Sequence, residues 1–199
     1  MLFQTDQPTR KWQEFQVKGY DFPVSGLIYK ASNPSVCGVP LGGVGTGCID
    51  IECDGTLGYS TIFNSLWPRA GPLNLPFLGI SIGRESWILS TKSIHGAIEG
   101  VANQFNESIT KSMDEIFYFG HYPVADLEYT SSCPLQLALR AWSPFIPGDI
   151  KVSATPCSIF ELYIKNPTEK KVEGVVVFSF PGPESYEVEE NPIFHHKII

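Results

Sequence analysis

The sequence predicts an all-β protein, an antiparallel β-sandwich with little helix. Several short runs alternate between apolar and polar residues with a period of two, which is typical of half-buried strands. Glycine and proline account for 18 and 16 of the 199 residues, and 13% of the residues are aromatic. This composition favours short strands and tight turns over a helical bundle. Turn sequences separate the runs at short spacing, as expected for hairpins that pack as two sheets.

The first part of the chain contains one clear hairpin. Residues 1–36 include three prolines and lack strict alternation, so we expect an extended lead-in with one or two edge strands. Residues 49–54 alternate isoleucine or cysteine with acidic residues, as a half-buried strand does. Asp54-Gly55 then predicts a turn, because glycine adopts positive φ without a steric penalty. Tyr59–Phe63 is the expected returning strand.

Later runs predict further strands. Phe77–Ile82 and Trp87–Leu89 form a pair around residues 83–86. Leu135–Trp142 places leucines on one face and Arg140 and Trp142 on the other. Residues 160–165 alternate in the same way, and we expect Val175–Phe180 to be their hairpin partner across the Asn166-Pro167-Thr168 turn. The one weak helical candidate is Asn106–Met113.

Composition also limits the compartment and the class of partner. The net charge of −7 argues against binding to nucleic acid or to an anionic membrane, because phosphate contacts need a basic surface. The N-terminus lacks the basic and apolar segments of a secretory signal, and no apolar run is long enough to cross a bilayer. The five cysteines are odd in number and form no C-x-x-C pair, which favours reduced thiols and a cytoplasmic location. They are Cys37, Cys48, Cys53, Cys133 and Cys157.

A glycine-rich loop covers residues 38–47. It lacks the G-K-[ST] ending of a phosphate-binding loop, and Cys48 stands where a dinucleotide fingerprint needs its third glycine. A strand rather than a helix is expected to follow it. We therefore interpret the loop as a bend where another backbone or a ligand approaches closely. Several of its glycines should need positive φ or lie against another backbone. These are Gly42, Gly43, Gly45 and Gly47.

The segment from Asp50 to Asp54 starts like a calcium loop. The bidentate glutamate needed at its twelfth position is missing, because that residue is Thr61. On a strand, Asp50, Glu52 and Asp54 share one face, and we expect them to be solvated rather than to bind a metal.

Asp126 and Glu128 form a second acidic pair on one face of a predicted strand. Two carboxylates about 5 to 10 Å apart are what glycoside hydrolysis requires, and residues i and i+2 satisfy that distance easily. An ion pair with Arg140 on a neighbouring strand is at least as plausible. The four histidines show no metal-ligand spacing, and residue chemistry alone identifies no active site, metal site or cofactor site.

Two blocks of sequence carry a resemblance to a known family. The first is Pro40–Gly47 followed by Ile62-Phe63-Asn64, and the second is Gly120–Tyr129. The second block is followed at matching distances by Ala141–Asp149, Ser153, Pro156 and Asn166. In order and spacing these blocks resemble the N-terminal region of glycoside hydrolase family 116, which includes the non-lysosomal glucosylceramidases and related β-glucosidases. The resemblance covers residues 38–181.

The resemblance implies an N-terminal β-sandwich followed by a larger (α/α)6 helical barrel. It implies a retaining mechanism whose glutamate nucleophile and aspartate acid/base both belong to the helical domain. We expect this chain to end before that domain and its sandwich to be incomplete, so that no residue here is catalytic. The implied division is a lead-in over residues 1–37, the sandwich over 38–181 and an unmatched tail over 182–199. No cofactor or metal is expected.

The favoured hypothesis is a non-catalytic sandwich that packs against the (α/α)6 catalytic domain of a β-glucosidase or glucosylceramidase. The candidate interface loop comprises Gly42, Gly43, Gly45, Gly47 and Asn64. A β-glucoside or glucosylceramide would then be bound through the parent enzyme. The alternative is a free-standing carbohydrate-binding sandwich with exposed aromatic residues. The candidates for these residues are Trp67, Trp87 and Trp142. Tryptophans in such a chain are, however, more often core residues. A nonfunctional remnant is the third possibility.

Overall fold

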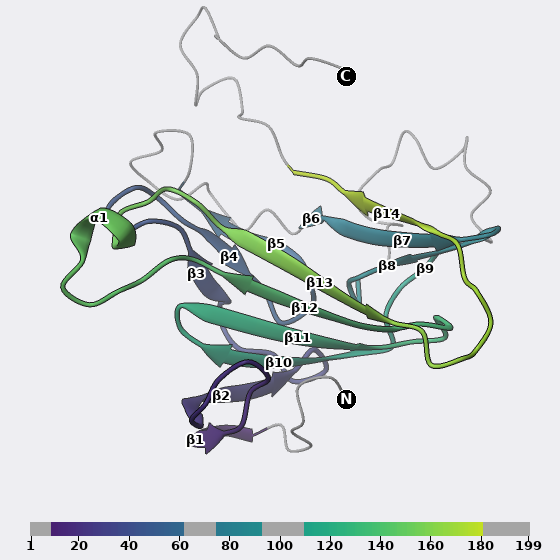
Figure 1. The fold of residues 1–199 in the computed structure, drawn as a ribbon, viewed down its shortest axis with the longest axis horizontal. Coiled ribbons are helices and arrows are strands. Elements are labelled where there is room, and N and C mark those ends of the chain that lie inside the picture. Colours follow the sequence, from purple (N-terminus) through teal and green to yellow (C-terminus); the bar gives the residue numbers. More distant parts are fainter. Residues whose placement is uncertain (1–8, 62–74, 93–109, 181–199) are drawn as a thin grey trace, which may run out of the picture.

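The fold of the chain is given by a computed structural model that describes residues 9–61, 75–92 and 110–180 (Figure 1). Within these ranges the structure consists of strands and one short helix, and nearly all neighbouring strands are antiparallel. The prediction of an all-β antiparallel sandwich is confirmed. In the same ranges, no helix has the length and apolar character needed to span a membrane.

One layer is a six-stranded sheet with the order β1-β2-β10-β11-β12-β13. Its strands are β1 (Thr9–Phe15), β2 (Val24–Lys30), β10 (Glu115–His121), β11 (Val124–Thr130), β12 (Gln136–Trp142) and β13 (Ile159–Lys165). β1 is an edge strand, as predicted for the lead-in, whereas the prediction is wrong for β2. β2 lies inside the sheet, where it pairs with β1 on one side and with β10 on the other.

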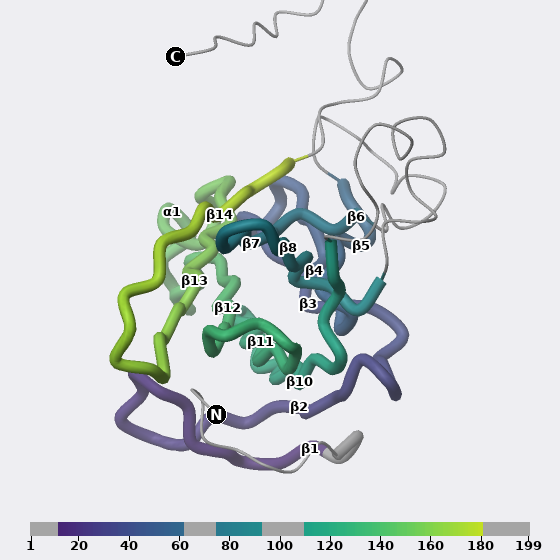
Figure 2. The backbone as a smooth tube through the Cα atoms, turned by 90° about the vertical axis from the view of Figure 1, so that its right-hand side faces the viewer, coloured from purple at the N-terminus to yellow at the C-terminus, as the bar shows by residue number. Residues whose placement is uncertain are grey.

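Two four-stranded sheets form the opposite layer, as the end view in Figure 2 shows. The first has the order β3-β4-β5-β6. It contains β3 (Val39–Leu41), β4 (Ile49–Ile51), β5 (Thr56–Ser60) and β6 (Leu75–Pro76). The second has the order β14-β7-β8-β9. It contains β7 (Leu78–Ile82), β8 (Glu85–Ile88), β9 (Thr110–Lys111) and β14 (Val175–Phe178), and its β8–β9 pair is parallel.

The local turn predictions hold at both early hairpins. Gly55 has φ +81° between β4 and β5, and Gly83 has φ +63° between β7 and β8. Such angles are easily reached only by glycine, so these residues fix where each hairpin reverses.

Two predictions of element type or pairing are wrong. β14 pairs with β7 rather than with β13, so the chain crosses from one layer to the other after β13. The run Val175–Phe178 is apolar without alternation, and it therefore carries no signal for the sheet that it joins. In the expected helix, residues 106–109 lie outside the described residues, Thr110–Lys111 is strand β9, and Met113 is buried in the core.

Most buried side chains lie between the two layers. They come from the inner faces of all three sheets and include Trp87, which is 1% exposed. A smaller cluster covers the outer face of the six-stranded sheet near β1 and consists of Phe15, Val17, Ile28 and Phe119. For Trp87 the core interpretation is confirmed. Trp142 is partly exposed on the outer face, and Trp67 lies outside the described residues.

Candidate functional site

The glycine loop joins β3 to β4 and bends as its sequence predicts. Gly42, Gly45 and Gly47 have φ values of +154°, +75° and +96°. Gly43 lies against a neighbouring segment, because a Cβ atom there would stand 2.5 Å from the carbonyl oxygen of Thr155. The prediction that these glycines adopt positive φ or contact another backbone is confirmed. Asn64, the fifth predicted loop residue, lies outside the described residues.

Hydrogen bonds hold this loop against the segment that contains helix α1 (Ile150–Ser153). The backbone N–H of Val44 donates to the carbonyl oxygen of Ser153 at 2.8 Å. The Ser153 hydroxyl donates to the Ile146 carbonyl and accepts from the Ile146 N–H, both at 2.9 Å. Asp149 caps α1 by accepting from the Val152 N–H at 3.0 Å. Two segments that are more than one hundred residues apart are therefore fixed to each other.

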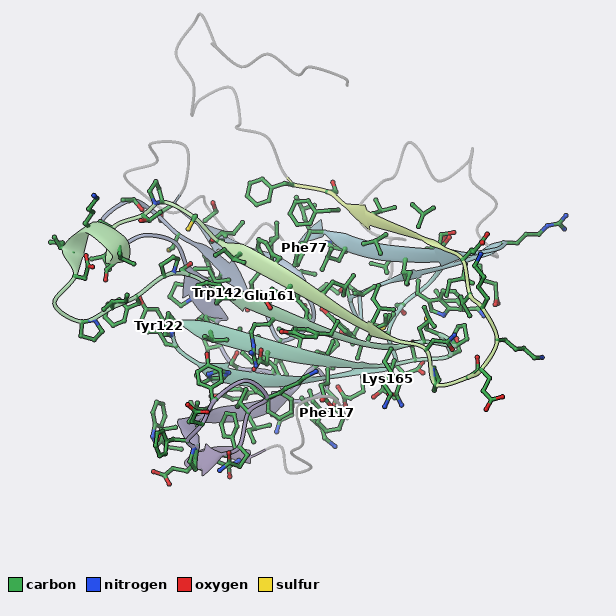
Figure 3. The ribbon with its side chains drawn as sticks, in the orientation of Figure 1. Phe77, Phe117, Tyr122, Trp142, Glu161 and Lys165 are labelled. Atoms are coloured by element: carbon green, nitrogen blue, oxygen red, sulfur yellow. The ribbon has the colours of Figure 1, made fainter. Side chains whose placement is uncertain are left out.

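Exposed apolar side chains gather at this end of the sandwich. Tyr122 follows β10, and its ring packs edge-on against Phe145 with the centroids 5.7 Å apart. Figure 3 shows Tyr122 at the end of the molecule near α1. We call this region the end surface. Its members, with their exposed fractions, are Val44 (50%), Tyr122 (55%), Phe145 (41%), Ile146 (52%) and Ile150 (79%).

A cleft opens beside the glycine loop, with a volume of about 350 Å³. Its floor includes Leu41 and Ile49, which are paired across β3 and β4 and are 1% and 2% exposed. We call it the Phe cleft because three phenylalanines form part of its wall. The described lining residues are Leu41, Gly42, Thr46, Gly47, Ile49, Pro156, Cys157, Ser158, Phe160, Phe178 and Phe180.

The three carboxylates on and after β4 differ in environment, and the expectation of a solvated acidic face is wrong for Asp50. Asp50 is only 8% exposed, and burial raises the pKa of its carboxyl to about 6. Burial, together with the nearby charge of Asp50, also raises the pKa of Glu52. Asp54 instead forms an ion pair with Lys92 at 2.9 Å and accepts from both the N–H and the hydroxyl of Thr56. Among the described residues, no group of three acidic, histidine or cysteine side chains is placed to hold a metal ion.

The second acidic pair is part of a structural network. Asp126 is fully buried and accepts from Arg140 Nε at 2.7 Å and from Arg140 Nη2 at 3.0 Å. His121 Nε2 lies 3.0 Å from the same carboxylate, and Tyr20 covers the guanidinium at 5.4 Å. The ion-pair interpretation of Asp126 is confirmed. A carboxylate occupied in this way has no free side from which to reach a glycosidic bond.

Sequence reasoning found the glycine loop but missed the end surface and the Phe cleft. Their residues come from segments separated by up to about 140 positions, and no local pattern marks them as neighbours. The available signal was the resemblance itself. Its blocks at Pro40–Gly47, Gly120–Tyr129 and Ala141–Asp149 meet at this end of the fold.

The fold and these sites define an all-β sandwich module with exposed apolar side chains at its loop end. Comparison with protein-family models matches residues 38–191 to the family described as beta-glucosidase 2, glycosyl-hydrolase family 116 N-term. The chain belongs to this family of N-terminal domains, as the sequence resemblance indicates. Comparison with curated proteins gives no match.

Proposed function

We propose that this chain is the non-catalytic β-sandwich portion of a β-glucosidase or glucosylceramidase and that it packs against an (α/α)6 catalytic domain through its end surface. The proposed limits are residues 38–181 for the sandwich, with a lead-in over 1–37 and a tail over 182–199; the family model also covers residues 182–191 of this tail. The location proposed for this protein is the cytoplasm.

The observation that supports this function best is the end surface. Five large apolar side chains are exposed there by 41% to 79%, and they are contributed by three separate segments. Exposed apolar side chains that gather in one region mark interaction sites, because their exposure to water is unfavourable. The glycine loop, with Gly42, Gly43, Gly45 and Gly47, carries Val44, whose backbone N–H is bonded to the Ser153 carbonyl next to helix α1. A rigid partner-binding surface loses little conformational entropy when it binds.

The chemistry of the described residues supports a role without catalysis. Retaining glycoside hydrolysis needs a nucleophilic carboxylate and a proton donor on either side of the scissile bond. Asp126 is held by Arg140 and His121, and Glu128 is 5% exposed on the same sheet face. We therefore propose that the carboxyl groups that hydrolyse a β-glucoside or glucosylceramide belong to the helical domain of the parent enzyme.

An activity assay tests this proposal. The purified chain is incubated with an aryl β-glucoside and with glucosylceramide, and no turnover is expected. Turnover that survives rigorous purification and disappears in Asp126→Asn or Glu128→Gln would overturn the proposal and make the sandwich itself the enzyme.

A carbohydrate-binding role is a second candidate, and one feature favours it. On the outer face of β12 and β13, the Trp142 indole N–H and the Tyr163 hydroxyl donate to the two oxygens of Glu161 at 2.7 and 2.8 Å. Figure 3 shows Trp142 and Glu161 side by side. Aromatic rings next to a fixed acceptor suit a polyhydroxylated ring. Titration with cellobiose should then quench tryptophan fluorescence in the parent chain but not in Trp142→Phe.

A further inference from the structure

We propose that the Phe cleft binds a small, uncharged amphiphile, with its apolar part against the phenylalanine rings and a hydroxyl group near Thr46 and Ser158. The cleft shares the glycine loop with the end surface, but none of its described lining residues is one of the five end-surface side chains, and the inference does not depend on the proposed domain packing. Three properties of the cleft lead to it: its size, its apolar wall and the absence of charge among its described lining residues.

The first property is concavity at the scale of a small molecule. The cleft encloses about 350 Å³, and small-molecule sites typically measure roughly 300 to 1,000 Å³. Its floor is firm, because Leu41 and Ile49 are buried and paired across β3 and β4. The glycine loop on one side is fixed by the hydrogen bonds between Val44 and Ser153 and between Thr46 and Gly43. Backbone pairing and hydrogen bonds therefore hold the floor and one side of the cleft.

The second property is an aromatic wall that is incompletely covered. Phe178 and Phe180 stack with their centroids 6.3 Å apart and their planes 6° from parallel. Phe160 packs against Phe178 at 5.7 Å. Phe178 and Phe180 nevertheless remain 51% and 43% exposed. An apolar group in the cleft would remove part of this ring surface from water, which is favourable.

The third property is neutrality combined with a polar end. None of the described lining residues carries a charge, so a charged ligand would lose hydration without gaining a counter-charge. Thr46 and Ser158 contribute hydroxyl groups to the lining. The Thr46 hydroxyl donates to the Gly43 carbonyl at 2.9 Å, which leaves its oxygen lone pairs to accept from a ligand hydroxyl. The lining thus selects an uncharged molecule with one apolar and one hydroxylated end.

The test compares two probes of equal chain length, 1-octanol and sodium octanoate, on the full 199-residue chain. Binding is followed by two-dimensional NMR of backbone amides at a pH where octanoate is ionised. We expect saturable shifts with 1-octanol at Thr46, Gly47 and Ser158, and affinity for octanoate at least tenfold lower. Absence of saturable shifts at these residues, or equal affinity for the two probes, would overturn the proposal.

Variants separate the cleft from other apolar surface. Ser158→Phe places a ring in the cleft at a partly exposed position, and Phe180→Ser removes one wall ring. Each should weaken octanol binding at least tenfold. Ile150→Ser alters the end surface and should leave binding unchanged. Octanol binding that is lost in Ile150→Ser, or retained in both cleft variants, would place the ligand elsewhere and refute the assignment.

Discussion

Replacing Asp50 by asparagine should stabilise the sandwich at neutral pH. Asp50 is 8% exposed, and burial raises the pKa of its carboxyl from 3.8 to about 6. A carboxyl with a raised pKa binds its proton more tightly in the folded state, so stability falls as the pH rises from about 4 to about 6. Above that window the charged carboxylate costs a constant amount of folding free energy. A shift of two pKa units corresponds to roughly 3 kcal/mol.

The expected gain for Asp50→Asn is therefore about 1 to 3 kcal/mol at pH 7, and it should vanish below about pH 4, where both side chains are neutral. The charge of Asp50 also raises the pKa of Glu52, so its removal relieves a second cost in the same direction. Urea unfolding followed by tryptophan fluorescence, repeated from pH 4 to pH 8, measures the difference between the variant and the parent chain.

Asp54→Asn is the matched control on the same segment. Asp54 forms an ion pair with Lys92, so its replacement should lower stability at pH 7 instead of raising it. The reasoning about Asp50 is refuted if Asp50→Asn is no more stable than the parent at pH 7, or if its advantage is the same at pH 4 and pH 7.

Three further predictions can be checked by the same urea unfolding assay. Gly45→Ala should lower the free energy of unfolding by about 1 kcal/mol, because alanine is strained at the Gly45 φ of +75°. Gly43→Ala should lower it further, because a Cβ at Gly43 would stand 2.5 Å from a backbone oxygen. Equal stability of the two variants would contradict this prediction. Arg140→Met should lower the free energy of unfolding by about 3 to 5 kcal/mol, because this variant leaves the buried Asp126 without its main counter-charge. A decrease of less than about 1 kcal/mol would contradict this prediction. Tyr129→Phe should be neutral or stabilising, since the Tyr129 hydroxyl is buried without a hydrogen-bond partner in the described part of the chain, and a loss of 2 kcal/mol or more would show that this hydroxyl is needed.

Local signals in the sequence were sufficient for much of the fold. Alternation along β12 places Leu137 and Leu139 in the core and Arg140 on the outer face, as observed. The glycine at position 55 marks the turn of its hairpin because its φ of +81° is a local backbone requirement. Such features depend on only a few neighbouring residues, so they can be read without knowledge of the tertiary structure.

Other features depend on which segments meet. The run Val175–Phe178 has no alternation to show whether β13 or β7 is its partner, and pairing with β7 is set by the tertiary fold. Asp50 follows the pattern of an exposed residue, yet neighbouring parts of the fold bury it. The end surface unites Val44, Tyr122 and Phe145 from three distant segments. Only the order of the family-like blocks suggested that these segments belong to one site.

In the proposed assembly, the end surface contacts the catalytic domain. Hydrogen–deuterium exchange of the chain, alone and mixed with the helical domain of a family 116 β-glucosidase, measures this contact. A complex is expected in which the backbone amides of residues 42–47 and 145–150 become protected, while those of β12 and β13 do not change. Failure to form a complex, or protection confined to β12 and β13, would contradict it.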